Sequence, residues 1–171
     1  TLANGGVASG IGAGATNLGS NANNTLLVFN GGTLAYLGES ASTDRDFNVQ
    51  GPFARFRIGH DRTVAEFGGN NRGGERIIKE GAGTMAMTNR STGILAWEVN
   101  EGTVEFYMNG GNNRFGSGIA DLYVGGGKLH VIGDPAASRS QQFGGQLTVN
   151  AGATTFQVTS TVNPAGDTGR N

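Results

Sequence analysis

Cysteine is absent from this sequence of 171 residues, so disulfide bonds and thiolate metal sites are both excluded. Only three prolines accompany 32 glycines, which excludes a collagen-like chain, because collagen needs abundant proline and a glycine at every third position. Twelve basic and 13 acidic residues leave a net charge of −1, which argues against a general nucleic-acid binder with a basic face. No apolar run approaches the roughly 20 residues of a membrane-spanning helix, so no membrane span is predicted.

Glycine is the residue in excess: average usage is about 7%, whereas 32 of the 171 residues here are glycine. Disorder would require few apolar residues and a high net charge, but 36% of the residues are hydrophobic and many of them alternate along the chain. The excess therefore indicates many tight corners between short strands, because glycine adopts the positive φ angles that such corners require. The length predicts a single domain.

One unit occurs six times: an apolar–any–apolar step, a glycine-rich corner, and a second apolar–any–apolar step. The units begin 20, 31, 19, 25 and 25 residues apart. Alternate residues of a strand face the same side, so each unit predicts two short, half-buried strands. Units at this spacing are typical of solenoids, which bury their apolar faces by stacking. The six are Leu27–Phe29 with Leu34–Tyr36, Phe47–Val49 with Ala54–Phe56, Ile78–Glu80 with Met85–Met87, Trp97–Val99 with Val104–Phe106, Leu122–Val124 with Leu129–Val131, and Leu147–Val149 with Thr154–Phe156.

Two all-β architectures fit these units. In a parallel β-helix, or β-solenoid, equivalent residues of successive units stack in columns, and six units plus the N-terminal segment give about seven rungs. In the alternative, each unit is a hairpin, with Asn30-Gly31 as a type I′ turn, and the hairpins form an antiparallel β-sandwich. We favour the solenoid because the column residues agree between units, whereas the turn residues do not.

The column assignment makes two specific predictions about the core. Trp97, Phe106, Leu122 and Phe156 should point inward and stack between rungs. Glu80 falls in an otherwise apolar column, where we expect it to have an arginine partner or to reach water at a strand end.

The chain divides into three predicted segments. Residues 1–25 are a lead-in rich in glycine and asparagine, either a linker or a weak strand; residues 26–158 hold the repeats, and residues 159–171 are a polar tail. Because the chain starts in mid-pattern at Thr1, we expect a mature or excised part of a longer product. Uncapped solenoid ends expose strand edges, so we expect contact with flanking repeats or head-to-tail self-association. In the second case the lead-in would add a strand to the next copy through Leu2, Val7, Ile11 and Leu18.

The central units share a pattern more specific than the alternation. It runs through Ile78–Asn89, Thr92-Gly93 and Val99–Val104, and its second half returns at Phe29–Leu34 and Val149–Gly152. Over about residues 25–158 this pattern resembles the autotransporter-associated β-strand repeat. Ser42–Phe47 is similar to a segment that often precedes such repeats in large bacterial surface proteins. The resemblance implies a right-handed parallel β-helix in a secreted or surface-displayed bacterial protein, with a structural, secretion-supporting or adhesive role. It supplies no catalytic residues, and residues 57–76 have no counterpart in the pattern.

The residues suggest no catalytic, cofactor or metal site. The two histidines, His60 and His130, lie 70 residues apart, and Asp61 would face away from His60 on a strand. Gly116-x-Gly118-x-x-Asp121 resembles a calcium-binding glycine repeat, but such sites need the motif in successive turns, and it occurs once.

Four acidic residues allow the hypothesis of a polysaccharide-degrading enzyme, because such enzymes use paired carboxylates. Asp121, Glu98, Glu101 and Glu105 could line one face of a β-helix. Glu98 and Glu105, however, occupy outward positions of the repeat, where a solvated carboxylate is the default expectation.

Arginines cluster in one short stretch of the sequence, and we predict that they form a partner-binding patch. It comprises Phe53, Arg55, Arg57 and Arg62, an arginine–aromatic stripe suited to an anionic glycan or an acidic partner. The competing interpretation is a set of solvated strand faces that discourage wrong pairing.

Together these features predict a non-enzymatic structural protein of the bacterial cell surface or extracellular space. Its partners would be copies of itself or flanking repeats, and no cofactor is expected. The alternative is an adhesin-type binding module for a glycan or a protein. A polysaccharide-degrading β-helix enzyme ranks below both.

Overall fold

The computed structural model describes residues 26–91, 93–109, 111 and 120–160. These residues form fifteen strands and no helix, and every strand pair is parallel. The strands belong to two six-stranded sheets and one three-stranded sheet. A bilayer-crossing helix is therefore not found in the described part of the chain.

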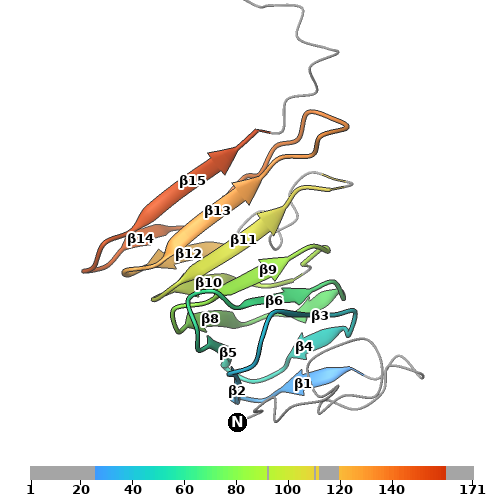
Figure 1. Cartoon of the computed structure of the whole chain (residues 1–171), viewed down its shortest axis with the longest axis vertical. Helices are drawn as coiled ribbons and strands as arrows, with labels where there is room; N and C mark the ends of the chain where they lie inside the picture. Colours follow the sequence, from blue (N-terminus) through green and yellow to red (C-terminus); the bar gives the residue numbers. More distant parts are fainter. Residues whose placement is uncertain (1–25, 92, 110, 112–119, 161–171) are drawn as a thin grey trace, which may run out of the picture.

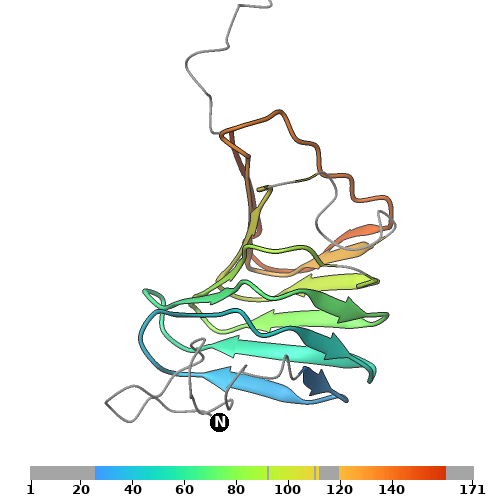
Figure 2. The same cartoon turned by 90° about the vertical axis from the view of Figure 1, so that its right-hand side faces the viewer.

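The three sheets are the sides of a solenoid, and the chain visits them in turn (Figures 1 and 2). The short sheet contains β1 (Leu27–Phe29), β4 (Phe47–Val49) and β7 (Asn71–Gly73). The first long sheet contains β2 (Thr33–Tyr36), β5 (Phe53–Ile58), β8 (Arg76–Glu80), β10 (Ala96–Val99), β12 (Asp121–Val124) and β14 (Leu147–Val149). The second long sheet contains β3 (Ala41–Thr43), β6 (Val64–Phe67), β9 (Thr84–Met87), β11 (Thr103–Tyr107), β13 (Lys128–Ile132) and β15 (Thr155–Thr159).

The parallel β-solenoid predicted from the repeats is confirmed, and the hairpin sandwich is wrong. Asn30-Gly31 is a corner between β1 and β2, which lie in different sheets, and Gly31 has the positive φ of 79° that the corner requires. Six strands in each long sheet correspond to about five turns from the first rung to the last. The expected seventh rung depended on the lead-in, which lies outside the described residues.

Side chains of successive rungs stack inside the solenoid as the alternation predicts. Trp97 is in register with Leu122, and both side chains are buried. The Trp97 ring packs edge-to-face against the buried Phe106 ring, with 4.9 Å between the ring centroids. Phe156 follows the same rule, because it lies in register with Leu129, yet it is 49% exposed. Since β15 has a neighbour on one side only, no further rung covers Phe156 within the described part of the chain.

The prediction that all six units align with one another is wrong between the second and third units. The first strands of the first two units, β1 and β4, belong to the short sheet, whereas the first strands of the later units belong to the first long sheet. The 31-residue interval between the second and third units contains an additional short strand, β7, whose sequence Asn71-Arg72-Gly73 has no apolar alternation. The first three rungs therefore have three sides, and the alternation alone could not reveal the third.

Glu80 does not stand in an apolar column. The inward residues of β8 are Ile77 and Lys79, both fully buried, and Glu80 lies on the outer face. There its Oε1 is 3.2 Å from Nε of Arg55, so the expected arginine partner is confirmed although the expected position is not.

Lys79 places an ammonium group inside the solenoid, in register between Phe56 and Val99. Its Nζ donates to three backbone carbonyls at the corners of two successive rungs: those of Glu80 (2.9 Å), Gly81 (2.6 Å) and Glu101 (3.1 Å). All three N–H donors are thus satisfied. A Cβ at Gly102 would lie 2.8 Å from this Nζ and 2.3 Å from the carbonyl oxygen of Gly81, so the corner requires glycine there.

Removing the Trp97 side chain should greatly reduce stability, because Trp97 fills the core between two rungs. We expect Trp97→Ala to lower the free energy of unfolding by about 3–5 kcal/mol, measured by urea denaturation. Leu95→Ala, which truncates a 44% exposed residue two positions away, is the control and should cost less than about 1 kcal/mol. Equal losses for both variants would contradict the core assignment.

Lys79 should make stability depend on alkaline pH. Burial lowers the pKa of Lys79 from 10.5 to about 8, opposed by the carboxylates of Glu101 and Glu80. Between these two pH values the unfolded chain binds the proton more tightly than the folded one, so Lys79 contributes more stability as pH rises. The difference in unfolding free energy between wild type and Lys79→Met should shift in favour of wild type by roughly 2–3 kcal/mol from pH 8 to 10.5. A difference independent of pH would refute this.

Candidate functional site

The predicted partner-binding patch is only partly assembled. Phe53, Arg55 and Arg57 lie on β5, and Arg62 lies in the turn that follows. The guanidinium of Arg55 sits over the ring of Phe53, 5.3 Å from its centre. Arg57 and Arg62 are exposed, and no hydrogen bond, ion pair or ring contact joins the side chain of either to Phe53 or Arg55 among the described residues.

The outer face of the first long sheet carries charges of both signs rather than a basic stripe. Arg55 is paired with Glu80, and Nη1 of Arg76 lies 2.9 Å from Oε2 of Glu98. The guanidinium of Arg76 also covers the ring of Tyr123 at 4.6 Å. Glu98 is thus outward, as predicted, but it is paired rather than freely solvated.

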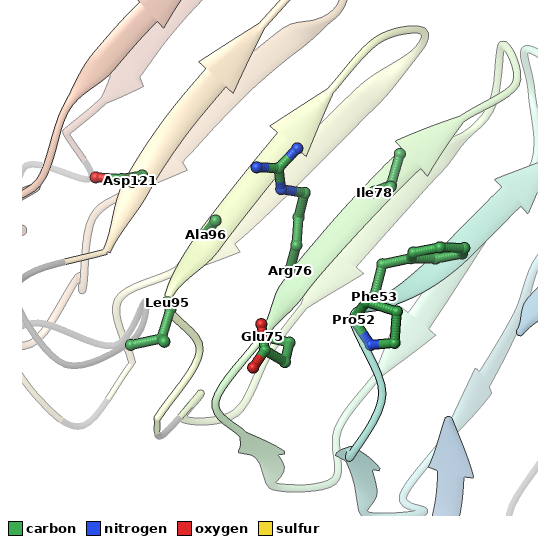
Figure 3. Close-up of a pocket in the computed structure, with 8 residues that line it drawn as sticks. All are labelled: Pro52, Phe53, Glu75, Arg76, Ile78, Leu95, Ala96 and Asp121. Carbon is green, nitrogen blue, oxygen red and sulfur yellow. The ribbon is translucent and has the colours of Figure 1, made fainter. Parts of the chain in front are cut away.

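A groove of about 310 Å³ is hollowed into this same face (Figure 3). Pro52 and Phe53 line it on the β5 side, and Asp121 lines it on the β12 side. Ile78, Leu95 and Ala96 supply apolar surface between them, together with the polar Glu75 and Arg76.

Sequence reasoning missed this groove, although it found Phe53. The lining comes from four strands or the residues just before them, and the residues span positions 52 to 121. Only the parallel register brings them together, and that register was misassigned for β8.

The outer face of the second long sheet carries a chain of hydrogen bonds across three strands. His130 on β13 contacts Oε1 of Glu105 through Nδ1 (3.1 Å) and Oγ1 of Thr159 through Nε2 (2.8 Å). The Tyr107 hydroxyl donates to Oε2 of Glu105 at 3.2 Å. Burial, and then the Glu105 carboxylate, raise the pKa of Tyr107. In the neutral tautomer with a proton on Nδ1, the imidazole donates to Glu105 and accepts from Thr159. These hydrogen bonds link the side chains of three successive rungs.

The remaining predicted residues do not form a site. His60 and Asp61 are exposed in the turn after β5 and are not brought near His130 by any contact in the described ranges. Asp121 accepts hydrogen bonds from the backbone N–H of Gln146 (2.7 Å) and the hydroxyl of Tyr123 (3.2 Å). Gly116 and Gly118 of the calcium-like motif lie outside the described residues. Within the described ranges no group of three or more histidine, aspartate or glutamate side chains could hold a metal ion.

The residues predicted to mediate self-association, Leu2, Val7, Ile11 and Leu18, also lie outside the described residues. The last described rung of the solenoid, formed by β14 and β15, exposes apolar side chains that continue the core columns. These are Leu147, Val149, Phe156 and Val158.

Comparison with known proteins gives one informative similarity. A relative described as "Adhesin BmaC autotransporter", from Brucella suis biovar 1 (strain 1330), is 33% identical over 162 residues. The alignment covers 93% of this chain but only 4% of the relative. No family model and no solved structure matches the chain. The chain is therefore similar to a small part of an autotransporter adhesin, and its membership of the autotransporter-associated repeat family stays a prediction.

Proposed function

We propose that this chain is a rod-forming segment of a bacterial surface protein with an adhesin-type, non-enzymatic role. The observation that carries the proposal is the similarity over 93% of the chain to a protein described as an autotransporter adhesin. The parallel solenoid supports it, because a stack of rungs is a spacer that presents the same lateral faces repeatedly.

Display on a non-adherent bacterium tests the adhesin role. We expect cells that carry the chain on an outer-membrane display scaffold to attach to cultured epithelial cells several times more often than cells with the empty scaffold. The same scaffold displaying Trp97→Ala, which lacks the central core side chain, should lose most of this gain. Counting attached bacteria by microscopy gives the result, and equal attachment by all three strains would contradict the adhesin role.

Self-assembly is a second candidate function, favoured by the exposed end of the solenoid. Val149 and Val158 are 60% and 78% exposed, yet they are in register with Val124 and Val131 of the preceding rung. The inward residues of the first long sheet at the opposite end, Leu34 and Tyr36, are buried. The exposed rung is therefore the surface on which another solenoid rung, from a further repeat or a second copy, would stack.

Light scattering at increasing protein concentration tests self-assembly. We expect a mass above that of one chain that rises with concentration, and a shift toward the single chain in Val158→Lys, because a charge at the edge discourages strand addition. Val64→Lys, which alters a 38% exposed valine on β6, should behave as wild type. A single chain at every concentration would rule self-assembly out.

A further inference from the structure

The groove on the first long sheet runs across four successive strands, β5, β8, β10 and β12 (Figure 3). Phe53, Arg76, Ala96 and Asp121 follow one another in register along it. Because Ala96 carries only a methyl group, the surface is hollowed between the longer side chains on either side of it. Strands about 4.8 Å apart make the three steps from β5 to β12 about 14 Å long.

The groove has an apolar base, and both hydrogen-bond donors and hydrogen-bond acceptors lie around it. Ile78 and Ala96 supply the base, and the exposed Leu95 borders it. Glu75 is exposed, and its carboxylate makes no hydrogen bond or ion pair within the described part of the chain. Arg76 is paired with Glu98 through one nitrogen, and a guanidinium has five N–H donors, so donors remain for a ligand.

We infer that this groove binds an uncharged glycan, laid along the solenoid axis; the inference rests on the proposed adhesin role. A polyanion would meet the carboxylates of Glu75 and Asp121, and a polycation would meet the guanidinium of Arg76. Sugar hydroxyls can donate to the carboxylates and accept from the guanidinium, and the C–H face of a sugar ring can pack on the Phe53 ring and the apolar base.

The size of the groove sets the length of the ligand. Its volume of about 310 Å³ is at the lower end of the roughly 300–1,000 Å³ of small-molecule sites. A pyranose unit is comparable in length to one strand spacing of about 4.8 Å, so the groove accommodates about three sugar units. This assignment differs from the anionic glycan predicted for the arginine patch, because only Phe53 is common to the two sites.

A glycan array followed by saturation-transfer NMR tests the inference on the whole chain. We expect neutral oligosaccharides to bind, and oligogalacturonate and trilysine not to bind. With the best neutral trisaccharide, Glu75→Gln should weaken binding about tenfold, the loss of one charge-assisted hydrogen bond. Ala96→Leu should abolish saturation transfer, because leucine fills the groove.

The matched control is Ala35→Leu, the same substitution on β2 of the same sheet, where Ala35 is in register with Arg57 and does not line the groove. It should bind as wild type, and thermal melting checks that each variant is folded. No binding of any neutral glycan, binding that survives Ala96→Leu, or binding of oligogalacturonate or trilysine at this groove instead would each overturn the inference. Bacterial attachment that persists with Ala96→Leu would overturn the glycan site alone and leave the adhesin role standing.

Discussion

Backbone pairing between successive rungs is the interaction on which the rest of this structure depends. The strands are only three to six residues long, too short to be stable alone. Each is held by parallel hydrogen bonds to the strand one turn before it, the strand one turn after it, or both. Parallel pairing in register forces position n of one rung over position n of the next. A residue type that fits the interior once must therefore fit beside itself, which explains the columns of aliphatic and aromatic side chains.

The same constraint determines how polar groups are accommodated. Lys79 is tolerated in a column because the corner carbonyls of its own rung and the next surround its ammonium. On the outer faces, Arg76 on β8 forms an ion pair with Glu98 on the neighbouring β10, and register places Glu105 directly beside His130, which it contacts through a hydrogen bond. Polar groups are thus paired across rungs.

The sequence predicted the parallel solenoid and the burial of Trp97, Phe106 and Leu122, because period-two alternation with recurring spacing is a strong signal. It failed at β8, where Ile77 and Ile78 are both apolar and allow either phase, and where one of the two inward residues is Lys79. It also missed β7, the third strand of the short sheet, since Asn71-Arg72-Gly73 has no alternation. The groove could not be predicted, because its lining residues lie up to 69 positions apart and come together only through the register of the strands, which local sequence does not specify.

Distance measurement across the stack tests the central claim of in-register stacking most directly. Thr33 and Thr148 lie on the outer face of the first long sheet, joined in register through β5, β8, β10 and β12. The chain has no cysteine, so Thr33→Cys and Thr148→Cys can be spin-labelled cleanly and measured by pulsed EPR. Five strand spacings predict a narrow distribution centred on a Cα separation of about 24 Å, before allowing for the label side chains. A broad distribution, or one centred far from this value, would contradict the stacking.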